Sequence, residues 1–247
     1  MTAYHNAVSD KLVVCSFPNR NYFQVYDKED QLKWSFVSSE ASSPQVLVDA
    51  IFSNSTYISV AQNFVLTPGN ASNKQEFYAL SYTEANTLEY TNVEDFTIVH
   101  NLTSRFNNLL QGTANAKICN DVSVVYPNIH KQAIKDSLYF YITEGVLTIF
   151  VHVKSNLHLI NRYKIESNDE LFYYVMLVVE QLDLPIESLN FECLATSGEH
   201  EVYQSLFKNY LPELELTKFQ SNLSFTPEDR NLKSEFLQSS YFAQCVL

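Results

Sequence analysis

Glycine is scarce in this chain of 247 residues, which has only four glycines, one tryptophan and two methionines. Glycine-rich loops bind phosphate groups because glycine alone lets successive backbone amides approach the phosphate oxygens closely. The four glycines are spread over the whole chain. A glycine-rich phosphate-binding loop is therefore excluded.

Basic residues are also few. The chain has 16 lysines and arginines against 28 aspartates and glutamates, which gives a formal net charge of −12, and the basic residues form no cluster. A field of this sign repels the phosphate backbone of nucleic acids. We therefore expect no nucleic acid partner.

Paired cysteines and long apolar runs are absent too. The four cysteines lie far apart with no CxxC pair, and no apolar signal segment follows the first residues. The nine successive apolar residues Leu171–Val179 fall well short of the roughly 20 that a membrane-spanning helix needs. These features predict a protein of the reducing cytoplasm that does not enter a membrane.

The stretch from Asp136 to Leu184 has the clearest pattern. Apolar residues alternate with others over 138–142, 147–154 and 157–165, with turns at Glu144–Gly145 and Ser155–Asn156. Period-two alternation is typical of a sheet with two unlike faces. We predict a three-stranded antiparallel meander whose polar face is solvated or lightly covered.

A helix should follow this meander. Ser167 and Glu170 match a capping box, the apolar run 171–179 comes next, and Pro185 ends it. A helix that is apolar on all sides is typical of a buried position, so we predict one buried nearly all round against the sheet.

The first half of the chain repeats this order. Strands are predicted at 12–17, 22–26 and 32–36, and a helix begins at Pro44. Leu12 and Leu138, which open the two meanders, are 126 positions apart. Further strands, helical segments and a closing helix follow in each half: strands at 57–66, 96–99, 188–195 and 214–219, and helices around 77–80, at 102–111 with Gly112 after it, around 202–210, and from 226 to about 239.

Gene duplication is the economical interpretation of this repeat. It divides the chain into an N-terminal half, 1–126, and a C-terminal half, 127–247. Residues 117–126 are expected to form a linking strand and 127–135 a connector. No low-complexity tract or run of like charges separates the halves, which favours halves packed closely together.

This element order resembles the actin-like ATPase fold, whose halves are ribonuclease H-like. The chain as a whole also resembles an uncharacterised family of Bacteroidota proteins assigned to that fold. The resemblance implies an α/β, mixed α+β, fold of two ribonuclease H-like halves in the actin-like ATPase arrangement. Each half would be a three-stranded antiparallel meander followed by helix, strand, helix and strand.

In active members of the actin-like group, two glycine-bearing hairpin turns and a glycine-rich adenosine loop hold ATP between the halves. By the resemblance, the first turn is Phe17–Asn21, which has no glycine and no acid. The second is Thr143–Gly145, and the adenosine loop is Ala195–Glu199, with one glycine where two adjacent ones are usual. The candidate ligand-binding residues of this cleft are Arg20, Glu144, Gly145, Ser197 and Gly198.

We predict no catalytic residue and no metal site. None of the six histidines has the spacing of a metal-binding motif, and His152 with His158 is interpreted as a surface pair on the polar face of the meander. A two-metal nuclease of the ribonuclease H type would need carboxylates inside the first strand of a half, where there are none.

The leading hypothesis is a cytoplasmic, non-enzymatic interaction or assembly protein that has lost its nucleotide-binding loops, uses no cofactor and binds a protein partner. The alternative is a diverged ATP-dependent phosphotransferase or ATPase, which alone would require ATP and Mg²⁺. A third possibility, a duplicated clamp-like ring protein, would need basic helices, and 171–182 has no lysine or arginine. Tyr139, Tyr141, Tyr173 and Tyr174 either dock a partner or fill gaps in the core.

Overall fold

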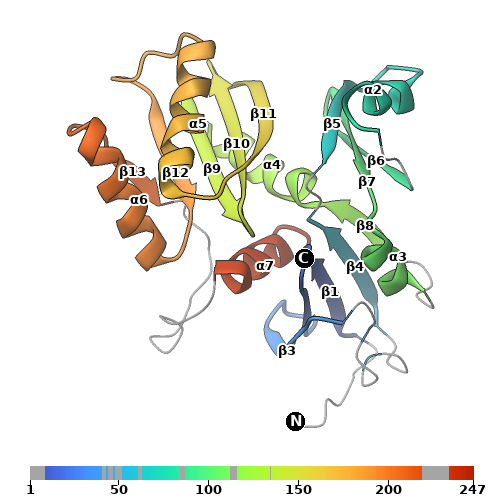
Figure 1. Ribbon diagram of the computed structural model, residues 1–247. Coiled ribbons are helices and arrows are strands. Elements are labelled where there is room, and N and C mark those ends of the chain that lie inside the picture. The colour runs from blue at the N-terminus through green and yellow to red at the C-terminus, as the bar shows by residue number, and fades with distance from the viewer. Residues whose placement is uncertain are drawn as a thin grey trace. The chain divides into compact units, whose positions relative to one another are not determined.

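The computed structural model describes residues 9–40, 43, 47, 52–60, 63–83, 87–111, 116–133, 135–218 and 234–247. The chain divides into two compact units (Figure 1). Unit 1 comprises Met1–Val125 together with Phe242–Leu247, and unit 2 comprises Tyr126–Tyr241. The two boundaries therefore fall inside helices α4, Asp121–Gln132, and α7, Ser234–Gln244.

Unit 1 contains a five-stranded sheet in the order β3-β2-β1-β4-β8. Its strands are β1 Lys11–Ser16, β2 Asn21–Tyr26, β3 Leu32–Ser38, β4 Asn54–Ser59 and β8 Lys117–Asn120. The first three strands form an antiparallel meander, as predicted, while β4 and β8 run parallel to β1. Val14, for example, lies between Phe23 on β2 and Tyr57 on β4.

A second, three-stranded sheet in unit 1 was not predicted. It consists of β5 Phe64–Pro68, β6 Leu88–Val93 and β7 Phe96–Asn101, in the order β5-β7-β6, with helix α2, Lys74–Ser81, next to β5 and β7. The single strand predicted over 57–66 is wrong, because β4 and β5 belong to different sheets. In α2 only Tyr78 is buried, whereas Leu80 is 85% exposed.

The core of unit 1 lies between its large sheet and helix α3, Ser104–Leu110. The helix begins with Thr103, whose hydroxyl oxygen accepts a hydrogen bond from the Phe106 amide. The buried residues of this core are Leu12, Val14, Phe23, Val25, Leu47, Tyr57, Leu102, Phe106 and Leu109. Most of the helix predicted from Pro44, and Gly112, lie outside the described residues.

The strand predicted over 117–126 ends early. It stops at Asn120, and α4 follows at once and contains Pro127. The Asn120 side chain accepts a hydrogen bond from the Val122 amide at 2.9 Å, which is the behaviour of a helix-capping residue. The β-branched run after Asp121 has the local preference of a strand, and burial of Val122 and Val125 in the helix overrides that preference.

Unit 2 contains a sheet of the same topology, in the order β11-β10-β9-β12-β13. Its strands are β9 Ser137–Thr143, β10 Val146–Val153, β11 Asn156–Lys164, β12 Asn190–Leu194 and β13 Leu216–Lys218. Strands β9 to β11 are an antiparallel meander, and β12 and β13 continue the sheet in parallel with β9. The predicted meander and the strand after it are confirmed.

Helices α5, Asn168–Gln181, and α6, Ser197–Tyr210, lie side by side on one face of this sheet (Figure 1). Leu171, Val175 and Val178 of α5 enter the core, but Tyr173 is 58% exposed. The prediction of a helix buried all round is therefore wrong. Among the described residues, no helix is long and apolar enough to cross a membrane.

The opposite face of the unit 2 sheet is covered as well. The Tyr126 and His130 rings of α4 lie against His152 of β10, and Gln238 of α7 contacts the end of β9. His152 is fully buried. The sequence prediction of a solvated polar face with a surface histidine pair is therefore wrong for His152, although His158 is exposed.

The cysteines should differ sharply in reactivity. Cys15, Cys119 and Cys193 are buried, whereas Cys245 is partly exposed. Burial raises the pKa of the Cys15 thiol, with the charge of Asp121 adding to the effect, and burial also raises the pKa of Cys119. Because thiolates are the reactive species, a disulfide reagent at pH 8 should modify Cys245 at least about tenfold faster than the others. Fast labelling that persists in Cys245→Ser would contradict this expectation.

Candidate functional site

The hairpin between β9 and β10 contains two of the candidate residues, Glu144 and Gly145. Both have positive φ angles, 46° and 77°, as a tight two-residue hairpin turn requires. The Gly145 carbonyl accepts a hydrogen bond from the Ile165 amide at 2.8 Å. A Cβ atom at Gly145 would lie 3.2 Å from the Ile165 oxygen. The turn geometry and this close approach account for the glycine without a ligand.

Gln238 of α7 covers the strand end next to this turn. Its side-chain oxygen accepts a hydrogen bond from the Thr143 hydroxyl at 2.8 Å, and its side-chain amide donates to the Ile142 carbonyl. Gln238 and Thr143 are both buried. The last polar groups of β9 are therefore occupied by a side chain of unit 2 itself.

Ser197 and Gly198 form the first turn of α6. Strand β12 runs parallel to β9, so the segment after β12 reaches the same edge of the sheet as the hairpin after β9. The structure thus brings Glu144, Gly145, Ser197 and Gly198 to one edge. A Cβ atom added to Gly198 would meet nothing within 4 Å, so no close backbone approach requires glycine there.

The N-terminus of α6 is closed by a complete capping box. The Thr196 hydroxyl accepts a hydrogen bond from the Glu199 amide, and the Glu199 carboxylate accepts from the Thr196 amide at 2.9 Å and from its hydroxyl at 2.8 Å. A carboxylate therefore already satisfies helix N-terminal donors of the kind that bind anions. The Thr196 and Glu199 spacing in the sequence could have revealed it.

Arg20, the fifth candidate residue, belongs to unit 1 and is partly buried in the turn between β1 and β2. The turn closes on itself, since the Phe17 amide donates to the Arg20 carbonyl at 2.8 Å. The Phe17 ring is buried and stacks on Phe242 at 6.5 Å, with Tyr22 edge-on at 5.3 Å. Aromatic side chains thus pack around the base of this turn.

Sequence reasoning missed a buried polar set at the carboxyl ends of β1, β4 and β8. Ser16, Ser59, Asn120 and Asp121 are all buried there. The Ser16 hydroxyl donates to the Asn21 side chain at 2.8 Å. The side-chain amide of Asn120 donates to the Ser59 carbonyl at 3.4 Å. The sequence signal was a polar residue directly after each short apolar run. Ser16, Ser59 and Asn120 thus bond to neighbours of the same unit.

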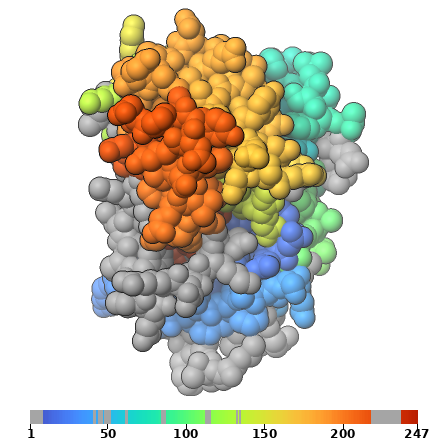
Figure 2. Space-filling model, turned by 60° about the vertical axis from the view of Figure 1, so that its left-hand side comes forward, coloured from blue at the N-terminus to red at the C-terminus, as the bar shows by residue number. Residues whose placement is uncertain are grey.

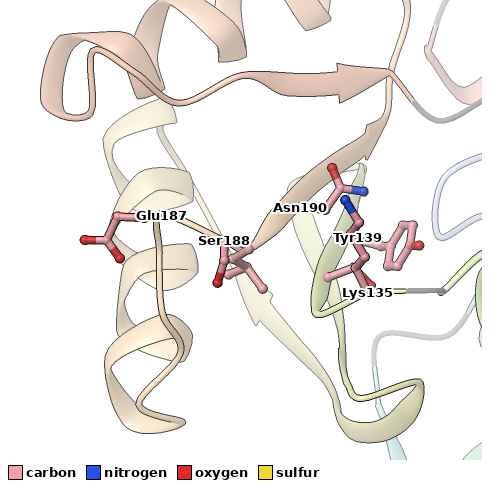
Figure 3. Close-up of a pocket in the computed structure, with 7 residues that line it drawn as sticks. Lys135, Tyr139, Glu187, Ser188 and Asn190 are labelled. Atoms are coloured by element: carbon pink, nitrogen blue, oxygen red, sulfur yellow. The ribbon is translucent and has the colours of Figure 1, made fainter.

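A polar pocket of about 490 Å³ lies at the amino ends of β9 and β12. It is lined by Lys135, Ser137, Tyr139, Glu187, Ser188, Leu189 and Asn190. Figure 3 shows Lys135, Tyr139 and Asn190 close together, with Glu187 pointing away from them. Burial raises the pKa of the Tyr139 phenol, which favours its protonated, hydrogen-bond-donating form. The arrangement can hold a small polar molecule but contains no nucleophile paired with a base.

His152 lies behind this pocket in a ring cluster. Its ring stacks on Tyr126 at 6.0 Å and lies 5.5 Å from His130 and 6.1 Å from Tyr139. Burial, together with the charges of His130 and His158, lowers the pKa of His152 to about 4. The imidazole is therefore neutral at pH 7. Among the described residues, no group of three or more potential ligands is placed to hold a metal ion.

Comparison with solved structures shows the fold. A Bacteroides thetaiotaomicron protein with actin-like ATPase fold and unknown function superposes with a TM-score of 0.74 and 11% identity, covering 85% of this chain and 91% of that chain. PilM, in the PilM-PilN type IV pilus biogenesis complex, superposes with a TM-score of 0.58 and 9% identity, covering 97% and 98%. The predicted actin-like fold is confirmed.

Comparison at the level of sequence identifies a family for this chain but no relative among curated proteins. The family model described as a protein of unknown function, DUF3822, matches residues 11–214. A search of curated proteins found no match.

Proposed function

Since the chain belongs to the DUF3822 family of proteins of unknown function and has the actin-like ATPase fold, we propose that it is a non-enzymatic interaction or assembly protein. In this proposal it works in the cytoplasm, binds a protein partner and has lost the nucleotide-binding loops of its fold. It needs no ATP and no Mg²⁺.

The observation that carries the proposal is the contact of Gln238 with the end of β9. A phosphate-binding hairpin must leave its backbone and hydroxyl donors open to the ligand. Here the Thr143 hydroxyl donates to Gln238, and Gln238 also engages the Ile142 carbonyl. A nucleotide that used the Thr143 hydroxyl as a donor would have to break its buried hydrogen bond to Gln238, which costs about 1–3 kcal/mol for a group left unsatisfied.

The other two loops support the same proposal. At the adenosine-loop position, the Glu199 carboxylate caps α6 and its charge opposes the approach of a phosphate. At the first turn, Pro18 has no amide hydrogen to donate, and the neighbouring Phe17 is buried among aromatic rings. The capped helix α6 and the proline in the first turn thus both support the proposed loss of the nucleotide-binding loops.

A structural neighbour supports the second half of the proposal, the protein partner. PilM has the same fold over nearly its full length and is found in a complex with PilN. A protein of this architecture can thus serve as one component of a protein complex. For the present chain the partner remains a proposal that rests on this precedent and on the closed loops.

Calorimetric titration with Mg-ATP tests the loss of the site. We expect no binding of micromolar affinity or tighter by the full-length protein. A micromolar or tighter dissociation constant would refute the proposal and favour a diverged phosphotransferase or ATPase. In that case Glu144→Gln should change a measurable turnover, and Glu201→Gln, on the exposed side of α6, is the matched control.

A further inference from the structure

Five aromatic side chains of unit 2 lie on α5 and on the neighbouring elements β11 and α6, as two stacked pairs with Tyr173 against one of them. We call Tyr163 of β11, Phe172, Tyr173 and Tyr174 of α5, and Tyr210 of α6 the aromatic band. Tyr163 stacks on Tyr174 with centroids 4.5 Å apart and planes at 20°, and Phe172 stacks on Tyr210 at 4.3 Å and 21°. Tyr173 meets Tyr174 edge-on at 5.2 Å. Figure 2 shows β11 in yellow, α5 in light orange and α6 in darker orange next to one another.

Rings of the aromatic band pack against the core of unit 2 on one side and are exposed to solvent on the other. Phe172 packs edge-on against the buried Phe207 ring at 5.4 Å, which fixes its position. Tyr173 and Tyr210 nevertheless expose 58% and 57% of their surface. Exposed aromatic rings in a fixed arrangement are a feature of sites where partners bind, because little side-chain entropy is lost on docking.

The exposed side of α5 carries negative charge, whereas Lys164 on β11 and Lys208 on α6 are exposed basic residues. Asp169 and Glu180 lie on the exposed side of α5, four residues before and seven residues after Tyr173, and α5 contains no lysine or arginine. Glu166 is exposed next to the start of α5, where its carboxylate pairs with Lys164 at 3.5 Å. The face of α5 around Tyr173 therefore favours a partner that offers positive charge.

We propose that the aromatic band is the docking surface for an arginine-bearing segment of a partner protein. A guanidinium group is planar and weakly hydrated, so it stacks on a tyrosine face and also binds a carboxylate through two parallel hydrogen bonds. A lysine ammonium has the same charge but lacks the flat face and the fork. The pairing of ring faces with flanking carboxylates on α5 therefore favours arginine over lysine.

Binding of two labelled peptides, measured by fluorescence anisotropy with the full chain, tests this. The probes are a (Gly-Arg)₄ peptide and a (Gly-Lys)₄ peptide of equal charge. We expect the arginine peptide to bind about three- to tenfold more tightly than the lysine peptide, the range that a stacked cation on an aromatic face gives. Equal affinities for the two peptides would overturn the proposal, because a net charge of −12 alone attracts both.

Variants locate the site. Tyr173→Ala should remove most of the preference for arginine, whereas Tyr90→Ala, which changes an exposed tyrosine on β6 of unit 1, should leave it intact. Asp169→Asn with Glu180→Gln should weaken both peptides, because the carboxylates attract either cation. Since Tyr173 is more than half exposed, the variant should unfold at the wild-type temperature. A preference that survives Tyr173→Ala would refute the aromatic band as the site.

This inference names the partner chemistry of the proposed function and rests on it, but the two fail separately. The peptide assay contains no nucleotide. Micromolar binding of Mg-ATP together with a preference for arginine would refute the proposed function and leave the docking surface in place. If neither binding of Mg-ATP nor a preference for the arginine peptide is observed, the docking surface is refuted and the proposed function stands.

Discussion

Replacing Phe207 with alanine should lower the free energy of unfolding of unit 2 by about 3–5 kcal/mol, the usual cost of removing a buried aromatic ring. Phe207 is fully buried, and its ring lies 5.4 Å from Phe172, 6.1 Å from Phe140 and 6.2 Å from Phe191. It therefore joins α5 and α6 to strands β9 and β12.

The measurement must follow unit 2 by itself. The single tryptophan, Trp34, lies on β3, so its fluorescence reports on unit 1. Hydrogen exchange of peptides from β9 and β12 in increasing urea reports on unit 2. Val202→Ala, on the same helix α6, is the control, because a side chain that is 49% exposed should contribute less than about 0.5 kcal/mol. A Phe207→Ala loss below about 1 kcal/mol would show that the ring is not part of this core.

Acid should weaken unit 2 through His152. The pKa of this buried imidazole is lowered to about 4 from 6.5, so the unfolded chain binds a proton more readily than the folded chain. The stabilising contribution is complete above pH 6.5 and is lost as the pH falls towards 4. The full difference corresponds to about 3 kcal/mol, and between pH 7.5 and 5.5 about 1.4 kcal/mol should disappear.

His152→Leu isolates this contribution. Leucine is close to histidine in volume and does not titrate, so the variant should lose about 1.4 kcal/mol less than the wild type between pH 7.5 and 5.5. Glu192, whose pKa burial raises, titrates in both proteins, and its contribution cancels in the comparison. The matched control is Ile149→Val, a buried and non-titrating change on the same strand, which should leave the pH dependence unchanged. Identical pH dependence in wild type and His152→Leu would refute the assignment.

Local patterns predicted unit 2 well. Alternating apolar residues on β9 and β10 have the period of a strand, and the Ser167 hydroxyl does accept a hydrogen bond from the Glu170 amide at 3.2 Å. The second half of that capping box differs, since the Glu170 carboxylate accepts from the Glu166 amide instead. Elements that depend on a few neighbouring residues could thus be read from the sequence.

Features set by distant residues could not be predicted. The alternation that places His152 on a polar face is correct, but Tyr126 and His130 of α4 cover that face. Gln238 is 95 positions from Thr143, and nothing in either local sequence indicates their contact. The order of the elements likewise predicted the candidate residues of the loops. It could not predict that Gln238 and Phe242, from far along the chain, pack next to two of those loops.

The stacking of Phe17 on Phe242 also bears on how the protein folds during synthesis. These two rings belong to the same unit, although they stand near opposite ends of the chain. Because contacts between residues far apart in sequence form late and slowly, the hydrophobic packing of unit 1 cannot be completed until the ribosome has made Phe242. Strand β1 is made before the whole of unit 2 and must wait for Phe242, whereas unit 2 is one continuous segment from Tyr126 to Tyr241. The apolar residues of β1 thus stay incompletely packed for longer than those of unit 2 while the chain is growing.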